Sequence, residues 1–412
     1  MKRFRSAVAL VVAAAVFATS VVPVADAVAA SPAGARVAAA APPSSGNARP
    51  PAGPPAPRAV VDALALDPAT EDRILALDPL HVSEKDIRDT LAGAPAPRII
   101  LSHGGVFPVF LIMWSFGKFL NKMGYPEASI RDPASGEWSY TPYDTTDRLA
   151  GLIAWAYEHE GMRPMMIGHS QGGLFVVKIL KRLAGQFGDS ARVYDPIRGS
   201  YQDRTTIVDP LTGKERPVVG LSMAYGSAVG AGGIALALPA WWEPLATLRK
   251  IPDTVDDFTG FFIDADLIAL SFTGNPLDVQ YEPTGTANVR NFRLPVTYNH
   301  ITVPITEDLA SDEGARAWID AYVPGKEQDT SGLSLNAQLH VLWAADVWYS
   351  IKKWWVLELQ RLIRARRGEA VPDAKAAVAP EPRPVVAPSP QPAAVPPQAP
   401  PPTAPPEPKP AG

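Results

Sequence analysis

A serine between glycines is the residue of this sequence best suited to nucleophilic chemistry. The segment GHSQG, residues 168–172, follows a short apolar run and precedes a helical pattern. In a tight turn from strand to helix, the serine adopts a strained conformation, and small residues two positions away on each side prevent collisions. The pattern predicts that Ser170 is a nucleophile at the end of a sheet, above the N-terminus of a helix. A chance match is the alternative.

A second motif, Ser102-His103-Gly104-Gly105, follows another predicted strand, earlier in the chain. Acyl transfer from a serine passes through a tetrahedral oxyanion, which requires preorganised N–H donors. One predicted donor is the backbone N–H of Gln171. The other is the backbone near Gly104 or Gly105, where the missing Cβ lets the main chain approach a substrate. An ordinary glycine turn is the alternative.

Together, the two motifs resemble the α/β-hydrolase superfamily in its lipase/esterase-like part. The resemblance covers roughly residues 97–323 and implies a triad in the chain order nucleophile, acid, histidine. Of the six histidines, only His300 and His340 follow Ser170. His300 lies between a β-rich run and a helical pattern, as the resemblance implies, whereas His340 lies inside a helical pattern. We expect His300 to take the Ser170 proton and return it to the leaving group, with His340 as the alternative.

The resemblance also implies a carboxylate that orients the histidine and stabilises its cationic form. Residues 267–272 are predicted to form a strand, and a glycine-containing segment then leads to Asp278. This arrangement is similar to the family's strand, glycine and aspartate, with a slightly longer gap, so Asp278 is the expected acid. Asp264 and Asp266 are alternatives that precede the predicted strand, and Asp278 could instead be a solvated loop carboxylate.

The type of nucleophile narrows the reaction. Relatives that cleave carbon–halogen bonds or epoxides place Asp at this position, whereas Ser170 indicates an acyl-enzyme and hydrolysis of an ester, thioester or amide. A carboxylic ester is the expected substrate. A catalytically silent binding protein and an acyltransferase are the alternatives. No histidine pair at helical spacing accompanies a carboxylate, so we expect neither a metal nor another cofactor.

Alternating apolar runs and helical patterns must position these residues. They predict an α/β fold, with a mostly parallel sheet and helices on both faces. The predicted strands are residues 98–101, 164–167, 218–225 and 267–272, and the predicted helices are residues 106–123, 144–160, 174–183 and 307–322. A Trp-rich segment at about 228–262 fits neither pattern and is predicted to be a lid-like insertion.

Apolar and aromatic side chains near the motifs give the only indication of the acyl group. They could line an apolar acyl pocket or pack in the core or lid: Phe107, Phe110, Met113, Trp114, Trp241 and Trp242.

An additional helix is predicted at residues 339–367, beyond the end expected for the family. Its apolar residues share one face: Trp348, Ile351, Trp355, Leu359 and Leu362. Tryptophan with a basic helix end suits a membrane interface. The alternative is packing against the domain, with the cations favoured by the helix dipole.

Both ends of the chain differ in composition from the middle. Residues 1–29 combine Lys and Arg, an apolar run and a small-x-small site, so we expect a signal peptide and export to the periplasm, cell envelope or exterior. An N-terminal anchor is the alternative. Of the 45 prolines, eight lie in residues 31–60 and 16 in residues 368–412. Residues 30–59 and 368–412 are therefore predicted to be a linker and a disordered tail, which leaves residues 60–367 as one domain.

Cysteine content and charge limit the remaining functions. The chain has no Cys, which excludes disulfides, cysteine metal sites and a thiol nucleophile. The 38 Lys and Arg nearly balance the 42 Asp and Glu, which argues against a nucleic-acid partner. We expect a small-molecule or lipid ester as substrate, and envelope contact through the Trp-rich helix and proline-rich tail.

Overall fold

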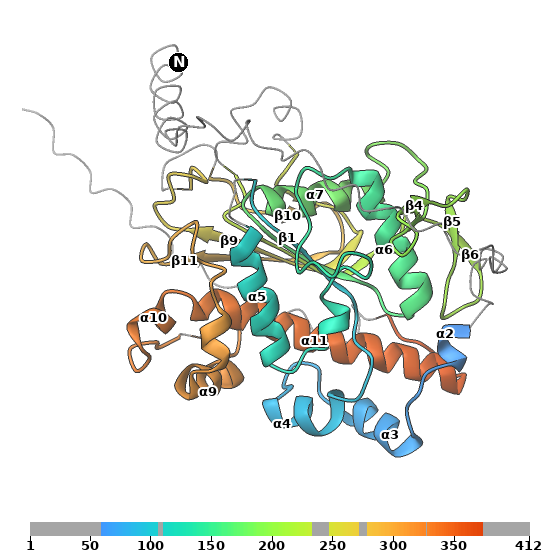
Figure 1. Ribbon diagram of the computed structural model, residues 1–412, viewed down its shortest axis with the longest axis horizontal. Helices are drawn as coiled ribbons and strands as arrows, with labels where there is room; N and C mark the ends of the chain where they lie inside the picture. Colours follow the sequence, from blue (N-terminus) through green and yellow to red (C-terminus); the bar gives the residue numbers. More distant parts are fainter. Residues whose placement is uncertain (1–58, 106–109, 233–246, 272–277, 327, 374–412) are drawn as a thin grey trace, which may run out of the picture.

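The computed structural model describes residues 59–105, 110–232, 247–271, 278–326 and 328–373. Five parallel strands form the central sheet in the order β1-β2-β7-β9-β11 (Figure 1). Their bounds are Ile99–Ser102, Met165–His169, Met223–Val229, Val255–Ile263 and Asn288–Leu294. Parallel strands bring all their carboxyl ends to one edge, and this edge holds the site described below. The predicted α/β fold is confirmed.

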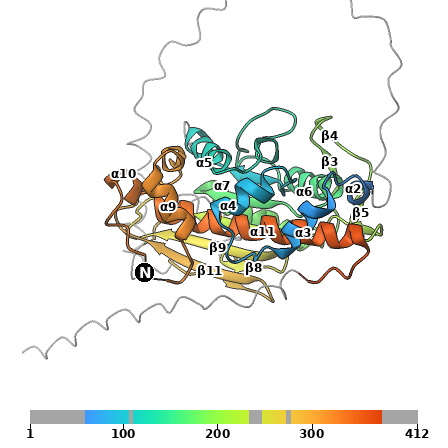
Figure 2. The same cartoon turned by 90° about the horizontal axis from the view of Figure 1, so that it is seen from below.

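Helices cover both faces of this sheet (Figures 1 and 2). Alternate residues of a strand point to opposite faces, so Ile100 packs toward α6 and α7, whereas Leu101 packs toward α5 and α11. The helices on the first face are α6 (Thr146–Glu160) and α7 (Gln171–Leu183), and those on the second are α5 (Phe110–Lys122), α9 (Glu313–Ala321) and α11 (Val341–Arg367).

The remaining elements are short. The helical ones are α2 (Ala59–Asp62), α3 (Pro68–Ala76), α4 (Glu84–Asp86), η1 (Ile87–Leu91), η2 (Glu127–Ser129), η5 (Glu307–Ala310) and α10 (Leu335–Gln338). The strands are β3 (Tyr194–Asp195), β4 (Ser200–Tyr201), β5 (Thr206–Val208), β6 (Glu215–Pro217), β8 (Lys250–Ile251) and β10 (Glu282–Pro283).

Helix ends coincide with the residues that favour them. The Thr145 hydroxyl accepts the Arg148 N–H at 3.1 Å and begins α6, which ends at Gly161 with φ 74°. The predicted helices at 144–160 and 174–183 are confirmed. The predicted helix at 307–322 is divided into η5 and α9, because Asp312 caps a new helix by accepting the Ala315 N–H at 3.0 Å.

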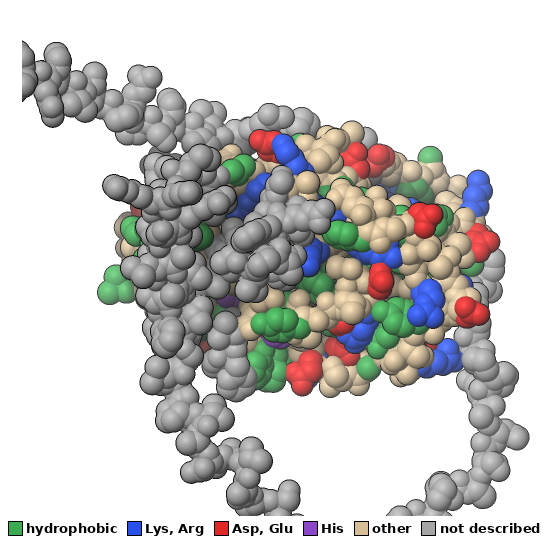
Figure 3. Space-filling view, turned by 90° about the horizontal axis from the view of Figure 1, so that it is seen from above, with side chains coloured by type: hydrophobic (Ala, Val, Ile, Leu, Met, Phe, Trp, Pro, Cys, Tyr) green, Lys and Arg blue, Asp and Glu red, His purple; other side chains and the backbone are tan. Residues whose placement is uncertain are grey.

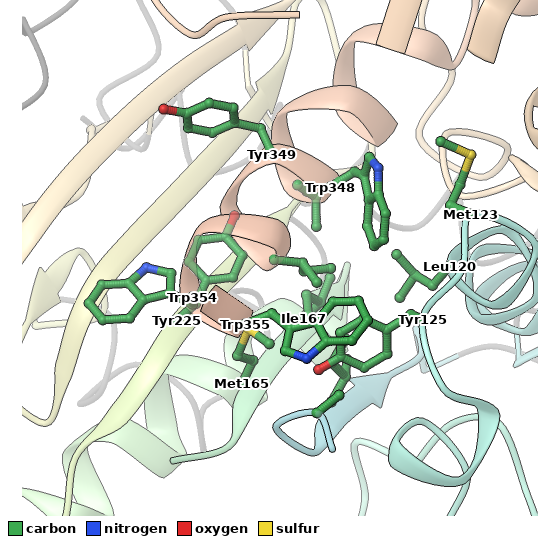
Figure 4. Packing of buried hydrophobic residues seen from close by; sticks show 14 of the residues in the cluster. Leu120, Met123, Tyr125, Met165, Ile167, Tyr225, Trp348, Tyr349, Trp354 and Trp355 are labelled. Atoms are coloured by element: carbon green, nitrogen blue, oxygen red, sulfur yellow. The ribbon is translucent and has the colours of Figure 1, made fainter. Parts of the chain in front are cut away.

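The additional C-terminal helix is present as α11, and it lies in the core. Its four tryptophans, at positions 343, 348, 354 and 355, are at most 2% exposed. The Trp355 ring lies 4.8 Å from the Tyr125 ring and belongs to the same buried cluster as Met165 and Ile167 of β2 and Leu120 of α5 (Figure 4). The four tryptophans are therefore not available to a membrane, and packing against the domain describes this helix.

The N-terminal segment covers the other side of α11, where α2 and α3 contact it. Polar side chains of α11 bind backbone carbonyls of this segment. Trp355 Nε1 donates to Pro95 at 2.9 Å, and Gln360 Nε2 donates to Ile74 at 3.0 Å. The helix is thus enclosed between the sheet and residues 59–97. Within the described parts of the chain, no helix is both long enough and apolar enough to cross a bilayer.

The predictions for residues 218–272 require correction. Residues 267–270 form a turn rather than a strand, and the strand in this region is β9, which begins inside the predicted lid-like insertion at 228–262 and ends at residue 263. The strand predicted at 218–225 begins later, at Met223. Asp256 and Asp257 interrupt the apolar pattern of β9, which explains the error. Their partners come from distant segments: Arg163 Nη1 lies 2.7 Å from Asp256 and Lys353 Nζ lies 2.5 Å from Asp257.

Several predictions fall outside the described residues. They concern the signal peptide at 1–29, nearly all of the linker at 30–59, the tail from residue 374 onward, and residues 233–246 of the insertion with Trp241 and Trp242. Phe107 also lies outside.

Candidate active site

Ser170 occupies the turn between β2 and α7. Its φ of 54° and ψ of −121° are strained values for a residue with a side chain. Its N–H donates to the carbonyl oxygen of Val229, at the end of β7, at 2.8 Å. The strand, strained serine and helix match the turn predicted from the sequence. The side chain is only partly buried, so Ser170 lies at the carboxyl edge of the sheet with a route to solvent.

The positions two residues before and after Ser170 have no room for a side chain, so only glycine fits there. A Cβ added at Gly168 would lie 2.3 Å from the carbonyl oxygen of Gly172. A Cβ added at Gly172 would lie 2.3 Å from the carbonyl oxygen of Ser102. Both contacts are with backbone, which cannot move aside as a flexible side chain can. The close approach also joins the two predicted motifs, because Ser102 begins the second one.

His300 connects Ser170 to a carboxylate. Its Nε2 lies 3.0 Å from Ser170 Oγ, and its Nδ1 lies 2.7 Å from Asp266 Oδ2. An ionised carboxylate only accepts hydrogen bonds, so Nδ1 carries the hydrogen and Nε2 is free to accept the hydroxyl proton. His300 and Asp266 are buried. This geometry can move a proton from the serine to the imidazole and stabilise the resulting cation.

His340 has a different position. It immediately precedes α11, it is buried, and burial lowers its pKa, although a hydrogen bond with the backbone of Val303 opposes this shift. Of the two histidines that follow Ser170, the structure therefore brings only His300 to the nucleophile.

The prediction of Asp278 as the acid is wrong. Its carboxylate accepts from Arg293 Nη2 at 2.8 Å and from Ser271 Oγ at 3.0 Å, whereas Asp266 contacts His300. Asp264, the other alternative, lies 3.7 Å from Arg293. The error follows from the misplaced strand. Because β9 ends at residue 263, Asp266 follows a strand after only two residues, and a position after a strand is where the resemblance implies an acid.

The loop of Asp266 holds its carboxylate in place. Oδ1 accepts the backbone N–H groups of Ile268 and Ala269, both at 2.9 Å, which leaves Oδ2 for His300. Ala265 and Leu270 adopt φ values of 59° and 55°. Together with Ser170, they are all the non-glycine residues of the described chain with positive φ. Backbone strain is thus concentrated at the nucleophile and the acid loop.

The predicted oxyanion residues lie beside each other. Gln171 is the first residue of α7, so its N–H has no acceptor within the helix. A Cβ added at Gly105 would lie 1.7 Å from Gln171 Oε1, which shows how closely the two motifs approach. The Gly105 carbonyl accepts the Tyr143 hydroxyl at 2.7 Å, and the Gly104 carbonyl accepts His103 Nδ1 at 2.7 Å. This loop is therefore anchored next to Ser170.

Sequence reasoning missed two residues of this site. Tyr143, which anchors the Gly105 carbonyl, lies in a polar loop with no motif to indicate it. Gly230 follows β7 with a φ of 58°, and a Cβ there would lie 3.0 Å from both Cε1 and Nδ1 of His300. A glycine directly after an apolar strand is a usable signal for Gly230, but the sequence pattern predicts that this strand ends too early, at residue 225.

Apolar side chains lie close to these candidate residues, either in space or in the chain. The Phe110 ring is 6.3 Å from the His103 ring and 5.1 Å from the Trp114 ring, whereas Met113 is fully buried in the core. Leu267 follows Asp266 and is 68% exposed, and Ile301 follows His300 and is 49% exposed. The described residues contain no cluster of three or more His, Cys, Asp or Glu arranged to hold a metal ion.

No protein-family model and no curated protein matches the sequence. One solved structure, described as "RedJ with PEG molecule bound in the active site", is similar over 53% of this chain and 88% of its own, with 16% identity and a TM-score of 0.25. This likeness is too weak to carry an argument. The α/β assignment rests on the parallel sheet and the helices on its two faces.

Proposed function

We propose that this protein is an exported serine hydrolase that cleaves a carboxylic ester through an acyl-enzyme. One observation carries the proposal: the continuous hydrogen-bonded chain from Ser170 Oγ through His300 to Asp266, with separations of 3.0 and 2.7 Å. The resemblance of the two glycine motifs to lipase/esterase-like α/β-hydrolases supports the same conclusion. The apolar segment near the N-terminus is the basis for proposing export.

The proposed reaction has two halves. In the first, Ser170 Oγ attacks the acyl carbonyl carbon while His300 Nε2 takes the hydroxyl proton, and the oxyanion forms beside Gln171 and the Gly104–Gly105 loop. The C–O bond to the alcohol then breaks, and His300 gives its proton to the leaving oxygen. In the second half, His300 takes a proton from water, the hydroxide attacks the acyl-enzyme, and the acid leaves as Ser170 regains its proton. Asp266 keeps its hydrogen bond to His300 Nδ1 in both halves.

An apolar acyl group is the proposed specificity. Phe110 lies beside His103 of the proposed oxyanion loop and packs against Trp114. Leu267 and Ile301, which follow Asp266 and His300 in the chain, expose apolar surface. Apolar surface of this kind favours binding of an apolar chain. A small-molecule ester and a lipid ester both fit, and a panel of esters with graded acyl length would separate them.

No nucleic-acid partner is part of the proposal. On the face shown in Figure 3, basic and acidic side chains are interspersed. A phosphate backbone is bound by a concentration of Lys and Arg. The proposed contact with the cell envelope depends on the proline-rich tail alone, because the tryptophans of α11 are buried.

Labelling with a fluorophosphonate probe and hydrolysis of p-nitrophenyl esters test the proposal. The wild-type protein should be labelled at Ser170 and should hydrolyse the esters. Ser170→Ala should prevent labelling and reduce kcat by about 10⁶-fold, whereas the exposed Ser200→Ala, on β4, should do neither. Wild-type turnover by Ser170→Ala would refute the assignment.

Two other outcomes identify the alternatives. A folded wild-type protein without label would favour a catalytically silent binding protein. Acyl transfer to an added alcohol in preference to water would indicate an acyltransferase, which uses the same acyl-enzyme.

A further inference from the structure

His169, the residue before the nucleophile, makes a contact that the proposed mechanism does not use. It ends β2 and is 1% exposed, and its Nε2 lies 2.7 Å from the backbone carbonyl oxygen of His300. A carbonyl oxygen only accepts, so Nε2 must carry the hydrogen. Nδ1 is then without a hydrogen. It is buried and has no hydrogen-bond partner within the described residues.

This environment keeps His169 neutral. Protonation would place a hydrogen on Nδ1, which has no hydrogen-bond partner among the residues that the structure describes. Burial, together with the nearby His300 and His103, lowers the pKa of His169 to about 3, although its bond to the His300 carbonyl opposes the shift. His169 is therefore a fixed neutral donor at the pH values at which ester hydrolysis is measured, and not a second base.

The contact joins two distant segments at the nucleophile. His300 lies in the loop between β11 and η5, while His169 adjoins Ser170 in the chain. The His300 side chain is held by Asp266 and Ser170, and its backbone is held by His169. The histidine loop is thus fixed directly to the strand that presents the serine.

We propose that His169 is a positioning residue, whose Nε2–H···O=C bond to His300 sets the imidazole at proton-transfer distance from Ser170. This inference rests on the proposed hydrolase function. A histidine that only packs in the core would need the shape of the ring but not the Nε2–H donor. Substitutions that keep one of these two properties therefore distinguish a packing role from a positioning role.

A pair of substitutions separates the donor from the shape. His169→Phe keeps an aromatic ring and removes the donor, whereas His169→Gln keeps an N–H donor at a similar distance from the backbone. A displacement of about 1 Å in a reacting group can cost about 10²-fold in rate. His169→Phe should therefore lower kcat by about 10- to 100-fold with little change in KM, and His169→Gln should restore most of it. Met165→Leu, on the same strand, is the packing control.

Three results would overturn the inference. They are wild-type kcat in a folded His169→Phe, no recovery in His169→Gln, and an equal kcat loss in Met165→Leu. Thermal unfolding of each variant ensures that folded protein is compared.

A spectroscopic measurement does not depend on turnover. In ¹⁵N-histidine NMR spectra of the wild-type protein and of Ser170→Ala, His169 should appear as the neutral Nε2–H tautomer and should not titrate between about pH 5 and 8. An Nδ1–H tautomer, or titration in that range, would overturn the inference even in an active enzyme. Absence of fluorophosphonate labelling with the expected tautomer would instead refute the proposed function, and the positioning role with it.

Discussion

Two regions of this molecule bury ionisable side chains, and they do so differently. Between the sheet and α11, charges meet as direct pairs: Lys353 Nζ lies 2.5 Å from Asp257, and Arg290 Nη1 lies 2.9 Å from Asp346. At the carboxyl edge of the sheet, the chain from Asp266 through His300 ends instead at a partly buried hydroxyl, on strained backbone.

The comparison shows that burial of charge does not by itself indicate a site. In each pair under α11, a charge on the sheet meets an opposite charge on the helix, and the backbone is unstrained. These pairs therefore hold the sheet and the helix together. The edge combines backbone strain with a hydrogen-bonded chain that ends at a partly buried hydroxyl. Substitutions in the two regions should therefore affect different quantities. Substitutions at the sheet edge should lower activity, and substitutions between the sheet and α11 should lower the free energy of unfolding.

The largest expected effect distinguishes two aspartates. Asp266→Asn should reduce kcat by about 10⁴-fold, because the amide no longer fixes the tautomer of His300 or stabilises its cation. Asp278→Asn is the matched control, since Asp278 contacts Arg293 and Ser271 and not His300. We expect near-wild-type kcat for the control with p-nitrophenyl esters. A greater loss in Asp278→Asn than in Asp266→Asn would restore the original assignment.

The next prediction concerns the layer under α11. Lys353→Met leaves Asp257 buried without its cation, which should lower the free energy of unfolding by about 3–5 kcal/mol. Urea denaturation measures this change. Turnover per folded molecule should be unchanged, because neither residue contacts the triad.

A double variant is the control for Lys353→Met. Asp257→Asn with Lys353→Met removes both charges and should recover much of the lost stability. A Lys353→Met protein as stable as the wild type would show that this pair does not stabilise the fold, and the contrast between the two regions would fail.

Acid should weaken the α11 region through Glu358. Burial would raise the pKa of this carboxyl, but the charges of Arg163 and Arg361 outweigh it and lower the pKa to about 2, from an ordinary 4.5. A carboxyl with a depressed pKa stabilises the folded state above pH 4.5, and this stabilisation is lost as the pH falls from about 4.5 toward 2. The loss amounts to about 3 kcal/mol.

Urea denaturation at a series of pH values tests this term. Glu358→Gln should be less stable at neutral pH, because Arg361 loses this counter-charge and Arg163 keeps only Asp256. Its stability should decline less steeply in acid. Glu313→Gln, on the exposed surface of α9, is the control. Equal acid slopes for Glu358→Gln and the wild type would contradict the prediction.

The sequence predicts the serine turn and the glycine loop better than it predicts the carboxylate that contacts His300. The first two depend on residues close together in the chain, whereas the carboxylate depends on contacts between distant segments. The proposed nucleophile and oxyanion residues lie in short motifs whose glycines are required by contacts within the motifs or between them, such as Gly168 with Gly172. His300 follows from chain order once the family resemblance is accepted. These features need no knowledge of the rest of the fold.

Asp266 could not be chosen in this way, because its choice depends on where β9 lies. β9 carries Asp256 and Asp257, which are tolerated in a buried strand only because Arg163 and Lys353 meet them. These cations come from a turn before β2 and from α11, far away in the chain. A hydrophobic pattern therefore does not identify β9 as a strand, and the segment is predicted to be part of a lid-like insertion. The strand is then predicted at 267–272, and the aspartate after that segment, Asp278, is chosen in place of Asp266. The buried ion pairs of β9 are therefore the reason that Asp266 cannot be identified from the sequence pattern.

The smallest expected effect is at Gly230, where the two kinds of constraint meet. Gly230→Ala places a methyl group 3.0 Å from the His300 ring at a φ of 58°, which should cost about 1–2 kcal/mol of stability. If the ring moves by a few tenths of an ångström, kcat should fall by about 10-fold, a fraction of the cost of a full 1 Å displacement. Gly93→Ala, which would meet nothing within 4 Å, should change neither quantity. Loss of stability with kcat unchanged would mean that Asp266, Ser170 and His169 hold the imidazole in place against the methyl group. The requirement for glycine at position 230 would then concern stability and not catalysis.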